Sequence, residues 1–127
     1  MVVQIKREEI PPDIVVLQVA GKLVLGRDSK ELEWAVDELV KKQGTKLILD
    51  LANLQFVDST GIGIIVMCSG KVKGAGGEIR LAGCRGMVED ILRRTRIDAI
   101  VPFCQTREHA AESLKGSSPA GAGGAQA

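Results

Sequence analysis

Residues 49–63 read Leu-Asp-Leu-Ala-Asn-Leu-Gln-Phe-Val-Asp-Ser-Thr-Gly-Ile-Gly, and this stretch decides the fold. It begins inside residues 46–51, a short apolar run typical of a strand that is covered on both faces. It continues into Asp-Ser-Thr at 58–60, three residue types that favour the start of a helix. We predict this helix over residues 62–72. A buried strand is therefore followed by a loop and a helix, the junction at which α/β domains commonly carry functional groups.

Two strands and a helix are predicted upstream of this stretch. Short runs rich in β-branched residues at 2–5 and 14–20 flank Pro-Pro-Asp at 11–13, which indicates two strands joined by a turn. Asp28 and Ser29 then offer helix caps. Apolar residues follow at the spacing of one helix face: Leu32, Ala35, Val36, Leu39 and Val40.

The downstream half repeats the alternation of strand and helix. Gly-Ala-Gly-Gly at 74–77 ends the helix. We predict a strand over 78–82, a helix from about Gly86, a strand over 100–103 and a helix over 107–114. The pattern indicates an α/β single domain over residues 1–115, with a mixed, mostly parallel sheet of four or five strands and helices mainly on one face.

Length and charge limit the classes of function. A chain of 127 residues fits one domain. Its last part, residues 116–127, lacks charged and large apolar groups, so we predict a disordered tail there. The 17 Lys and Arg residues balance 16 Asp and Glu residues, for a net charge of +1. Such a balance argues against direct binding of nucleic acid or of an anionic membrane surface.

Motifs for catalysis and cofactor binding are missing from the sequence. The single histidine, His109, belongs to no recognisable catalytic pattern, and Ser59 lacks the GxSxG setting of hydrolases. Gly61 and Gly63 do not extend to GxGxxG because Val66 takes the third glycine position. The cysteines have no CxxC spacing and are interpreted as reduced, buried thiols of a cytoplasmic protein. We therefore predict no enzyme activity, no cofactor and no metal.

The order and spacing of these segments resemble the STAS domain, and in particular its anti-sigma factor antagonists. That family carries Asp-Ser-Ser/Thr-Gly-Leu/Ile-Gly at the start of its second helix, which residues 58–63 match. The likeness extends over residues 2–114. It includes the segments Gly21 to Leu23, Leu47 to Leu51, Gly76 to Glu78 and Arg93 to Ile97.

The resemblance implies a switch at Ser59, the position that a partner kinase phosphorylates in this family. The unphosphorylated protein would bind an anti-sigma factor, often the serine kinase itself, and so free a sigma factor for transcription. Phosphorylation would end the binding, and a phosphatase would restore it. Two other functions stay open: a STAS accessory subunit of a transporter or stress-signalling complex, and a small-nucleotide-binding domain that uses the Ser59 loop as an anion site. The oligomeric state is open as well, with a weak homodimer as one alternative.

Each residue around Ser59 also has a structural role open to it. From the residues alone, Ser59 or Asp58 could be a plain helix cap. Asp58 matches the acidic residue of the family motif, so it caps the helix or contacts the kinase and its nucleotide. Thr60 matches the second hydroxyl residue and is expected to cap the helix start. Gly61 and Gly63 allow close approach of another backbone, either that of a partner or that of the protein's own sheet.

The helix after the motif is apolar nearly all round, which indicates either complete burial or a docking surface. Ile64 and Met67 fall well off the side that carries most of its apolar residues. A small domain can hardly bury an outer helix on every side, so we expect both to be exposed beside Ser59 as a binding patch. The alternative is coverage by a neighbouring helix. Trp34, nearly opposite the core face of the first helix, either contacts a partner or covers the domain's own surface.

The sequence departs from the family where many antagonists read Gly-Glu/Asp-Leu-Asp after the second strand. Lys22 and Val24 replace the two acids near the expected docking surface, although Asp28 is close enough in sequence to substitute. A local basic set is expected to be a solvated face: Arg85, Arg93, Arg94 and Arg96. The residues expected to bind the partner are Lys22, Val24, Asp58, Thr60, Gly61, Ile62, Gly63, Ile64 and Met67.

Overall fold

The computed structural model describes residues 3–26, 29–42 and 44–115. The predictions made for Asp28 and for the tail at 116–127 lie outside these residues. Across the described residues, no helix combines the length and the apolar character that crossing a lipid bilayer requires.

The chain begins with an antiparallel hairpin. Strand β1 (Val3–Ile10) pairs with β2 (Ile14–Leu23) through the predicted turn at 11–13. Both strands run further than predicted. β1 is an edge strand, and most of its exposed side chains are charged, for example Arg7 and Glu9, so its later half lacks the apolar signal of a strand.

Four further strands complete a six-stranded sheet in the order β1-β2-β3-β5-β6, with β4 paired to β2. All pairings after the hairpin are parallel, which confirms the predicted mixed, mostly parallel sheet. The sheet has one strand more than the four or five predicted. The additional strand is β4, which has only four residues and lies within the stretch predicted as a loop. The bounds are β3 (Lys46–Asp50), β4 (Leu54–Val57), β5 (Glu78–Ala82) and β6 (Phe103–Cys104).

Strand β2 forks. Its first part, Ile14 to Gln18, lies beside β3, whereas its last part, Gly21 to Leu23, lies beside β4. The register shifts between Gly21 and Lys22, at a β-bulge. The fork carries the end of β2 and the end of β4 together to one edge of the sheet.

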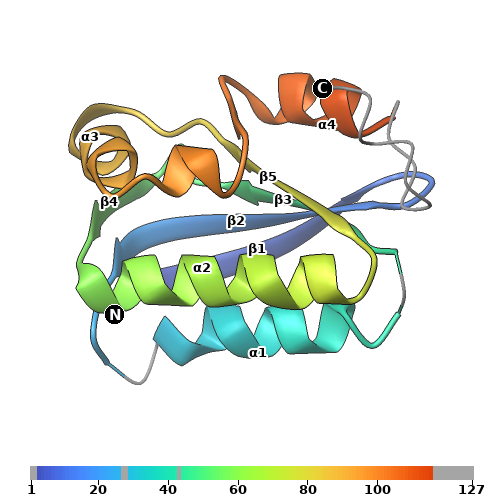
Figure 1. Ribbon diagram of the computed structural model, residues 1–127, viewed down its shortest axis with the longest axis horizontal. Coiled ribbons are helices and arrows are strands. Elements are labelled where there is room, and N and C mark those ends of the chain that lie inside the picture. Colours follow the sequence, from blue (N-terminus) through green and yellow to red (C-terminus); the bar gives the residue numbers. More distant parts are fainter. Residues whose placement is uncertain (1–2, 27–28, 43, 116–127) are drawn as a thin grey trace.

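Helices cover both faces of the sheet, with most on one face. Figure 1 shows α1 (Lys30–Leu39) and α2 (Ser59–Gly74) side by side on one face and α4 (Arg107–Lys115) on the other. Helix α3 (Gly86–Arg94) contacts β4, and its buried residues join the same core cluster as those of α1 and α2. The prediction of helices mainly on one face is confirmed.

The two faces of the sheet explain the continuous apolar run in β3. All five of its residues are buried. Leu47 and Leu49 belong to the large cluster with α1 and α2, whereas Ile48 belongs to the small cluster with α4. Each such side chain contributes about 1.5–3 kcal/mol of transfer free energy on burial. The sheet is therefore a rigid platform for the loops at its edge.

Three further local predictions differ from the structure. Helix α2 begins at Ser59, three residues earlier than the predicted 62, so Ser59 is the first helical residue. Ser29 precedes α1 but makes no capping bond, because its buried hydroxyl bonds to Val24 instead. The strand predicted over 100–103 is displaced: a 3-10 helix (Ile97–Ala99) comes first, and β6 begins only at Phe103.

Candidate functional site

The forked end of β2 brings two loops together at one edge of the sheet. Lys22 and Leu23 pair with Phe56 and Val57 of β4, immediately before α2 starts. The backbone N–H of Asp58 donates to the carbonyl oxygen of Leu23 at 3.3 Å. The segment of Lys22 and Val24 is thereby placed beside the Asp-Ser-Thr motif; that these residues bind a partner stays a prediction.

Asp58 caps helix α2. Its backbone is extended, and its Oδ1 accepts the N–H of Gly61 at 2.9 Å. Its Oδ2 accepts the N–H of Leu25 at 3.0 Å. The bond from Leu25, followed by the bond from Gly61, lowers the pKa of the Asp58 carboxyl below its ordinary range. The capping role is therefore confirmed, while contact with a kinase stays a prediction.

Ser59 occupies the first turn of α2 and is exposed to solvent. Within the described residues its hydroxyl has no hydrogen-bond partner. Thr60 beside it is half-buried, and no cap is made by its side chain, since Asp58 already fills that role. The structure thus leaves Ser59 accessible to an enzyme that modifies hydroxyl groups.

The two glycines of the motif have different surroundings. Gly61 is buried, and a Cβ atom there would lie 2.7 Å from Cγ2 of Val57 and closer still to the carbonyl oxygen of Leu23. Its missing side chain therefore serves packing against the protein's own sheet. Gly63 is exposed, and a Cβ atom there would meet nothing within 4 Å. Only Gly63 leaves its space open to a visiting molecule.

The exposed side of α2 differs in part from the one expected. Met67 is 43% exposed, as predicted, but Ile64 is only 6% exposed, so the expectation that it forms part of an open patch is wrong. Ile64 lies two turns before Lys71, which bonds to Glu33 and Asp37 of α1. It therefore belongs to the side of α2 that packs against α1. Ile62 is half-buried.

Sequence reasoning missed two exposed apolar residues near this site. Val66 lies one turn from Gly63 on the solvent side of α2 and is 37% exposed. Leu25 follows β2 and is 78% exposed. At ideal helical spacing Val66 lies on the same side as Ile62 and Ile65, which predicts burial, and Leu25 falls in a loop without periodicity. For Leu25, the sequence signal of an exposed apolar group is a leucine that lies outside every predicted helix and strand. We call Ser59, Gly63, Val66 and Met67 the α2 surface.

Other expected positions have simple environments. Lys22 is exposed and Val24 is half-buried. Trp34 is exposed on α1, which excludes a purely internal role. The arginines around α3 are exposed, as expected of a solvated face, and Arg93 bonds to Glu89 and lies over the ring of Phe103.

Two of the three cysteines, Cys68 and Cys84, are poor nucleophiles in this fold. Cys68 is buried on α2, and burial raises the pKa of its thiol to about 12. Burial likewise raises the pKa of the half-buried Cys84 to about 12. Among the described residues, no group of three or more His, Cys, Asp and Glu side chains could hold a metal ion. His109 is exposed.

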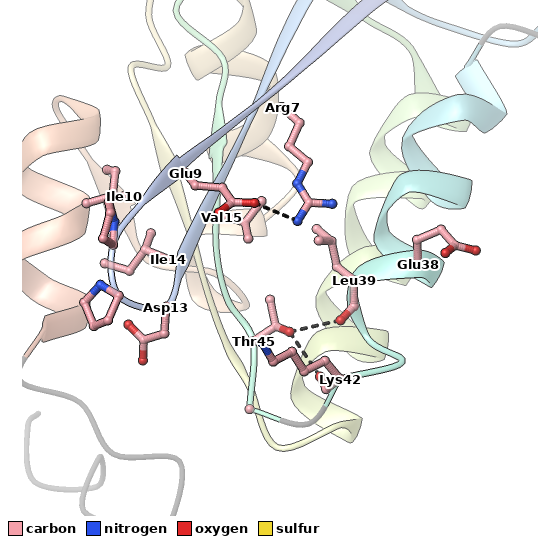
Figure 2. Close-up of a pocket in the computed structure, with 13 residues that line it drawn as sticks. Arg7, Glu9, Ile10, Asp13, Ile14, Val15, Glu38, Leu39, Lys42 and Thr45 are labelled. Atoms are coloured by element: carbon pink, nitrogen blue, oxygen red, sulfur yellow. Dashed lines mark hydrogen bonds and ion pairs between the residues drawn. The ribbon is translucent and has the colours of Figure 1, made fainter.

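Two of the hollows in the described part of the protein have charged linings and lie away from Ser59. One, lined by Arg7, Glu9, Asp13, Glu38 and Lys42 among others, lies between the hairpin turn and the end of α1 (Figure 2). Its lining carries both positive and negative side chains. Two of them, Arg7 and Glu9, already form an ion pair, with Nη2 of Arg7 3.0 Å from Oε2 of Glu9. The other, of about 540 Å³, lies at the ends of β3, β5 and β6.

This second hollow is lined by a carboxylate that is already bound. Asp50 accepts hydrogen bonds from the N–H of Ala52 at 3.0 Å and from Nε of Arg107 at 2.9 Å. Arg107 also bonds to Glu8. Arg107 pairs with both Glu8 and Asp50 here, so the Asp50 carboxylate is already occupied, and the α2 surface and its loop are the stronger candidate site.

Comparison with known proteins gives a consistent result. A family model described as STAS domain matches residues 6–110. A protein of Thermotoga neapolitana named "Putative anti-sigma factor antagonist TM1081 homolog" is 30% identical over 108 residues, 85% of this chain and 96% of that protein. The crystal structure of TM1081 from Thermotoga maritima superposes with a TM-score of 0.77 at 26% identity, covering 87% of this chain and 94% of that one.

A more distant relative shares the fold. The anti-sigma factor antagonist SpoIIAA in its unphosphorylated form superposes with a TM-score of 0.70 at 18% identity, covering 91% of this chain and 99% of that chain. SpoIIAA of Bacillus in the phosphorylated form superposes with a TM-score of 0.67 at 15% identity, covering 86% and 97%.

Proposed function

The chain belongs to the STAS domain family and to its anti-sigma factor antagonists, and we propose that it works as a switch in which Ser59 is the phosphorylated residue. Unphosphorylated, it binds an anti-sigma factor that is also a serine kinase. Phosphorylated, it is released, until a phosphatase removes the phosphoryl group. The chain is then a substrate and regulator rather than a catalyst, and it controls sigma-factor-dependent transcription in the cytoplasm.

The observation that carries this proposal is the position of Ser59. It is exposed, it opens a helix of 16 residues, and it lies at the head of the α2 surface. A protein that packs on this surface covers the Ser59 hydroxyl. A kinase that binds the same surface has that hydroxyl within reach of its nucleotide.

Electrostatics explains how a phosphoryl group ends binding without refolding the domain. Phosphoserine carries about −1.5 to −2 charges at neutral pH. In the free protein this charge faces water and the positive end of the α2 dipole, which both favour it. In a complex, the same charge would be covered by the partner and would lose its hydration, a penalty of several kcal/mol. The fold is therefore retained while the complex is lost.

The α2 surface supports the idea of a flat, partly apolar contact. Gly63 lets a partner approach the helix backbone, while Val66 and Met67 supply apolar side chains. Met is a frequent residue at adaptable binding surfaces because its side chain is flexible and polarisable. Lys22 adds a positive charge where relatives carry an acid, so the partner's surface there should carry no matching arginine or lysine.

Intact mass spectrometry tests the proposal after incubation with a candidate anti-sigma factor kinase and ATP. We expect the mass gain of one phosphoryl group on the natural chain and on Thr60→Ala, and no gain on Ser59→Ala. Thr60 is the matched control because it is the neighbouring hydroxyl residue. A phosphoryl group on Thr60, or turnover of ATP by this chain alone, would contradict the proposal.

A further inference from the structure

Leu25 combines an exposed side chain with a fixed backbone. Its side chain is the most exposed of the large apolar groups among the described residues, at 78%. Its N–H donates to Oδ2 of Asp58 at 3.0 Å. Directly before it, Val24 is held from the other side, because its N–H and carbonyl oxygen both bond to the hydroxyl of Ser29. An apolar side chain is thus presented to solvent from a backbone that is held at Val24 and at the N–H of Leu25 itself.

The residue that holds Leu25 is the same residue that caps α2. One oxygen of the Asp58 carboxylate binds the loop after β2, and the other binds Gly61 in the first turn of α2. Both are bonds from a backbone N–H to an ionised group, which are stronger than neutral ones. The carboxylate therefore links the position of Leu25 to the start of α2, where Ser59 lies.

We propose that Asp58 is a positioning residue for partner binding: it holds Leu25 beside Ser59 as an apolar contact for the partner, and a phosphoryl group on Ser59 releases it. The proposal rests on the switch at Ser59 proposed above and adds a second contact point to the α2 surface. The occupant is the anti-sigma factor kinase, which would offer Leu25 an apolar pocket.

The release follows from competition at one helix end. A phosphoryl group brings three strong acceptor oxygens and a double negative charge next to the Asp58 carboxylate. These oxygens compete for the N–H groups of the first turn, including that of Gly61. Two neighbouring anions also repel each other, which disfavours the carboxylate in its present place. The bond from Leu25 is the outer one and is open to water, so its N–H can exchange Asp58 for solvent.

Release would weaken binding even before the phosphoryl group meets the partner. A held Leu25 is already ordered for contact, whereas a released one must be ordered again when the partner binds. Preorganised groups bind more tightly because this loss of conformational freedom has occurred in the free protein. The conformational freedom of Leu25 would thus depend on whether Ser59 is phosphorylated.

Amide hydrogen exchange, followed by NMR on the isolated chain, tests the proposal without any partner. The chain is prepared with serine and with genetically encoded phosphoserine at position 59. We expect exchange of the Leu25 amide to become about tenfold faster in the phosphoserine form, the effect of losing one hydrogen bond. The Gly21 amide, bonded to the carbonyl of Asn53 at 3.1 Å, is the control and should not change. Equal Leu25 exchange in both forms would overturn the proposal.

Two variants separate the parts of the argument. Asp58→Ser keeps a capping oxygen for Gly61 but has no second oxygen for Leu25, so Leu25 exchange should rise about tenfold while Gly61 stays protected. Unchanged Leu25 protection in this variant also overturns the proposal. Leu25→Ala keeps the bond to Asp58 but should weaken kinase binding about tenfold; unchanged affinity would exclude Leu25 as a contact. If phosphoserine frees Leu25 yet kinase binding persists, the switch itself fails while the link through Asp58 stands.

Discussion

Gly61 lies against the carbonyl oxygen of Leu23 so closely that no Cβ atom fits between them. The contact joins the first turn of α2 to the end of β2, across the fork of the sheet. It fixes how near α2 approaches the sheet and therefore where Ser59 stands. The next glycine, Gly63, faces open space, so the two positions form a natural pair for mutation.

Gly61→Ala and Gly63→Ala should change stability in opposite directions. The first must displace α2 from β2, and overpacking of this kind costs about 1–3 kcal/mol. The second adds a better helix former at an exposed position, which should stabilise by up to about 1 kcal/mol. Urea unfolding of both variants measures the difference. Equal stabilities would mean that the contact with Leu23 does not constrain the helix.

Ser59→Asp should weaken binding to the anti-sigma factor kinase by at least about tenfold, because the partner would cover an unpaired charge. Ser59→Ala should bind as the natural chain does, since it adds no charge. Isothermal titration with both variants measures this. The same affinity for the two would remove the electrostatic basis of the switch.

Met67→Ala should weaken kinase binding by about tenfold, the effect expected of an apolar contact at an interface. Its stability should change little, because the side chain is 43% exposed. Met87→Ala is the control, since Met87 is exposed on α3, outside the α2 surface. Equal losses of affinity in both variants would place the contact elsewhere.

Arg96→Gly should stabilise the fold by about 0.5–1 kcal/mol. Arg96 is the one non-glycine residue with a positive φ among the described residues, at 65°, just after α3 ends. Glycine takes this conformation without strain. Arg94→Gly, at the last residue of α3, should destabilise instead, by up to about 1 kcal/mol. Thermal unfolding compares them, and destabilisation by Arg96→Gly would contradict the strain argument.

The buried thiols should make the fold sensitive to alkali. Burial raises the pKa of Cys68 and Cys84 to about 12, from the ordinary 9.0. A raised folded-state pKa gives stability that is complete below pH 9 and is lost as the pH rises toward 12. Above the unfolded value each thiol should cost about 1.4 kcal/mol per pH unit. Urea unfolding at increasing pH measures this slope.

The double variant Cys68→Ala with Cys84→Ala is the control for the alkaline slope, since it lacks both thiols. Its stability should fall less steeply with pH than that of the natural chain. The same slope in both proteins would assign the alkaline sensitivity to other groups.

The sequence carried enough information for the alternation of strands and helices and for a mostly parallel sheet, but too little for the contacts between segments that are distant in the chain. The continuous apolar run of β3 predicted burial on both faces because both faces are in fact covered. Asp58 was recognised as a potential cap from its position before a helix. β4 is absent from the prediction because its four residues, with one exposed polar side chain at Gln55, are too few to show the alternation of apolar and polar residues that is typical of a strand.

Ile64 and Leu25 show what periodicity omits. Helical spacing places Ile64 away from the core face of α2 and therefore predicts exposure. The spacing does not show that the neighbouring helix α1 covers that side of α2. Leu25 is positioned by Asp58, 33 residues later in the chain, through a backbone bond that no side-chain pattern records. Long-range contacts of this kind are decided by the fork in β2, and they become visible only in three dimensions.

The fork in β2 also separates two parts of this strand that have different strand partners. The stem, Ile14 to Gln18, pairs with β1 on one side and β3 on the other. The prong, Gly21 to Leu23, pairs with β4, and of its residues only Gly21 also pairs with β1 in the described part of the chain. Replacing the prong, β4 and the first turn of α2 with those of a relative would exchange the segments proposed to contact the partner and leave the stem and its neighbouring strands unchanged. We therefore expect that substitutions beyond the bulge change the proposed partner binding while the paired strands of the stem stay as they are.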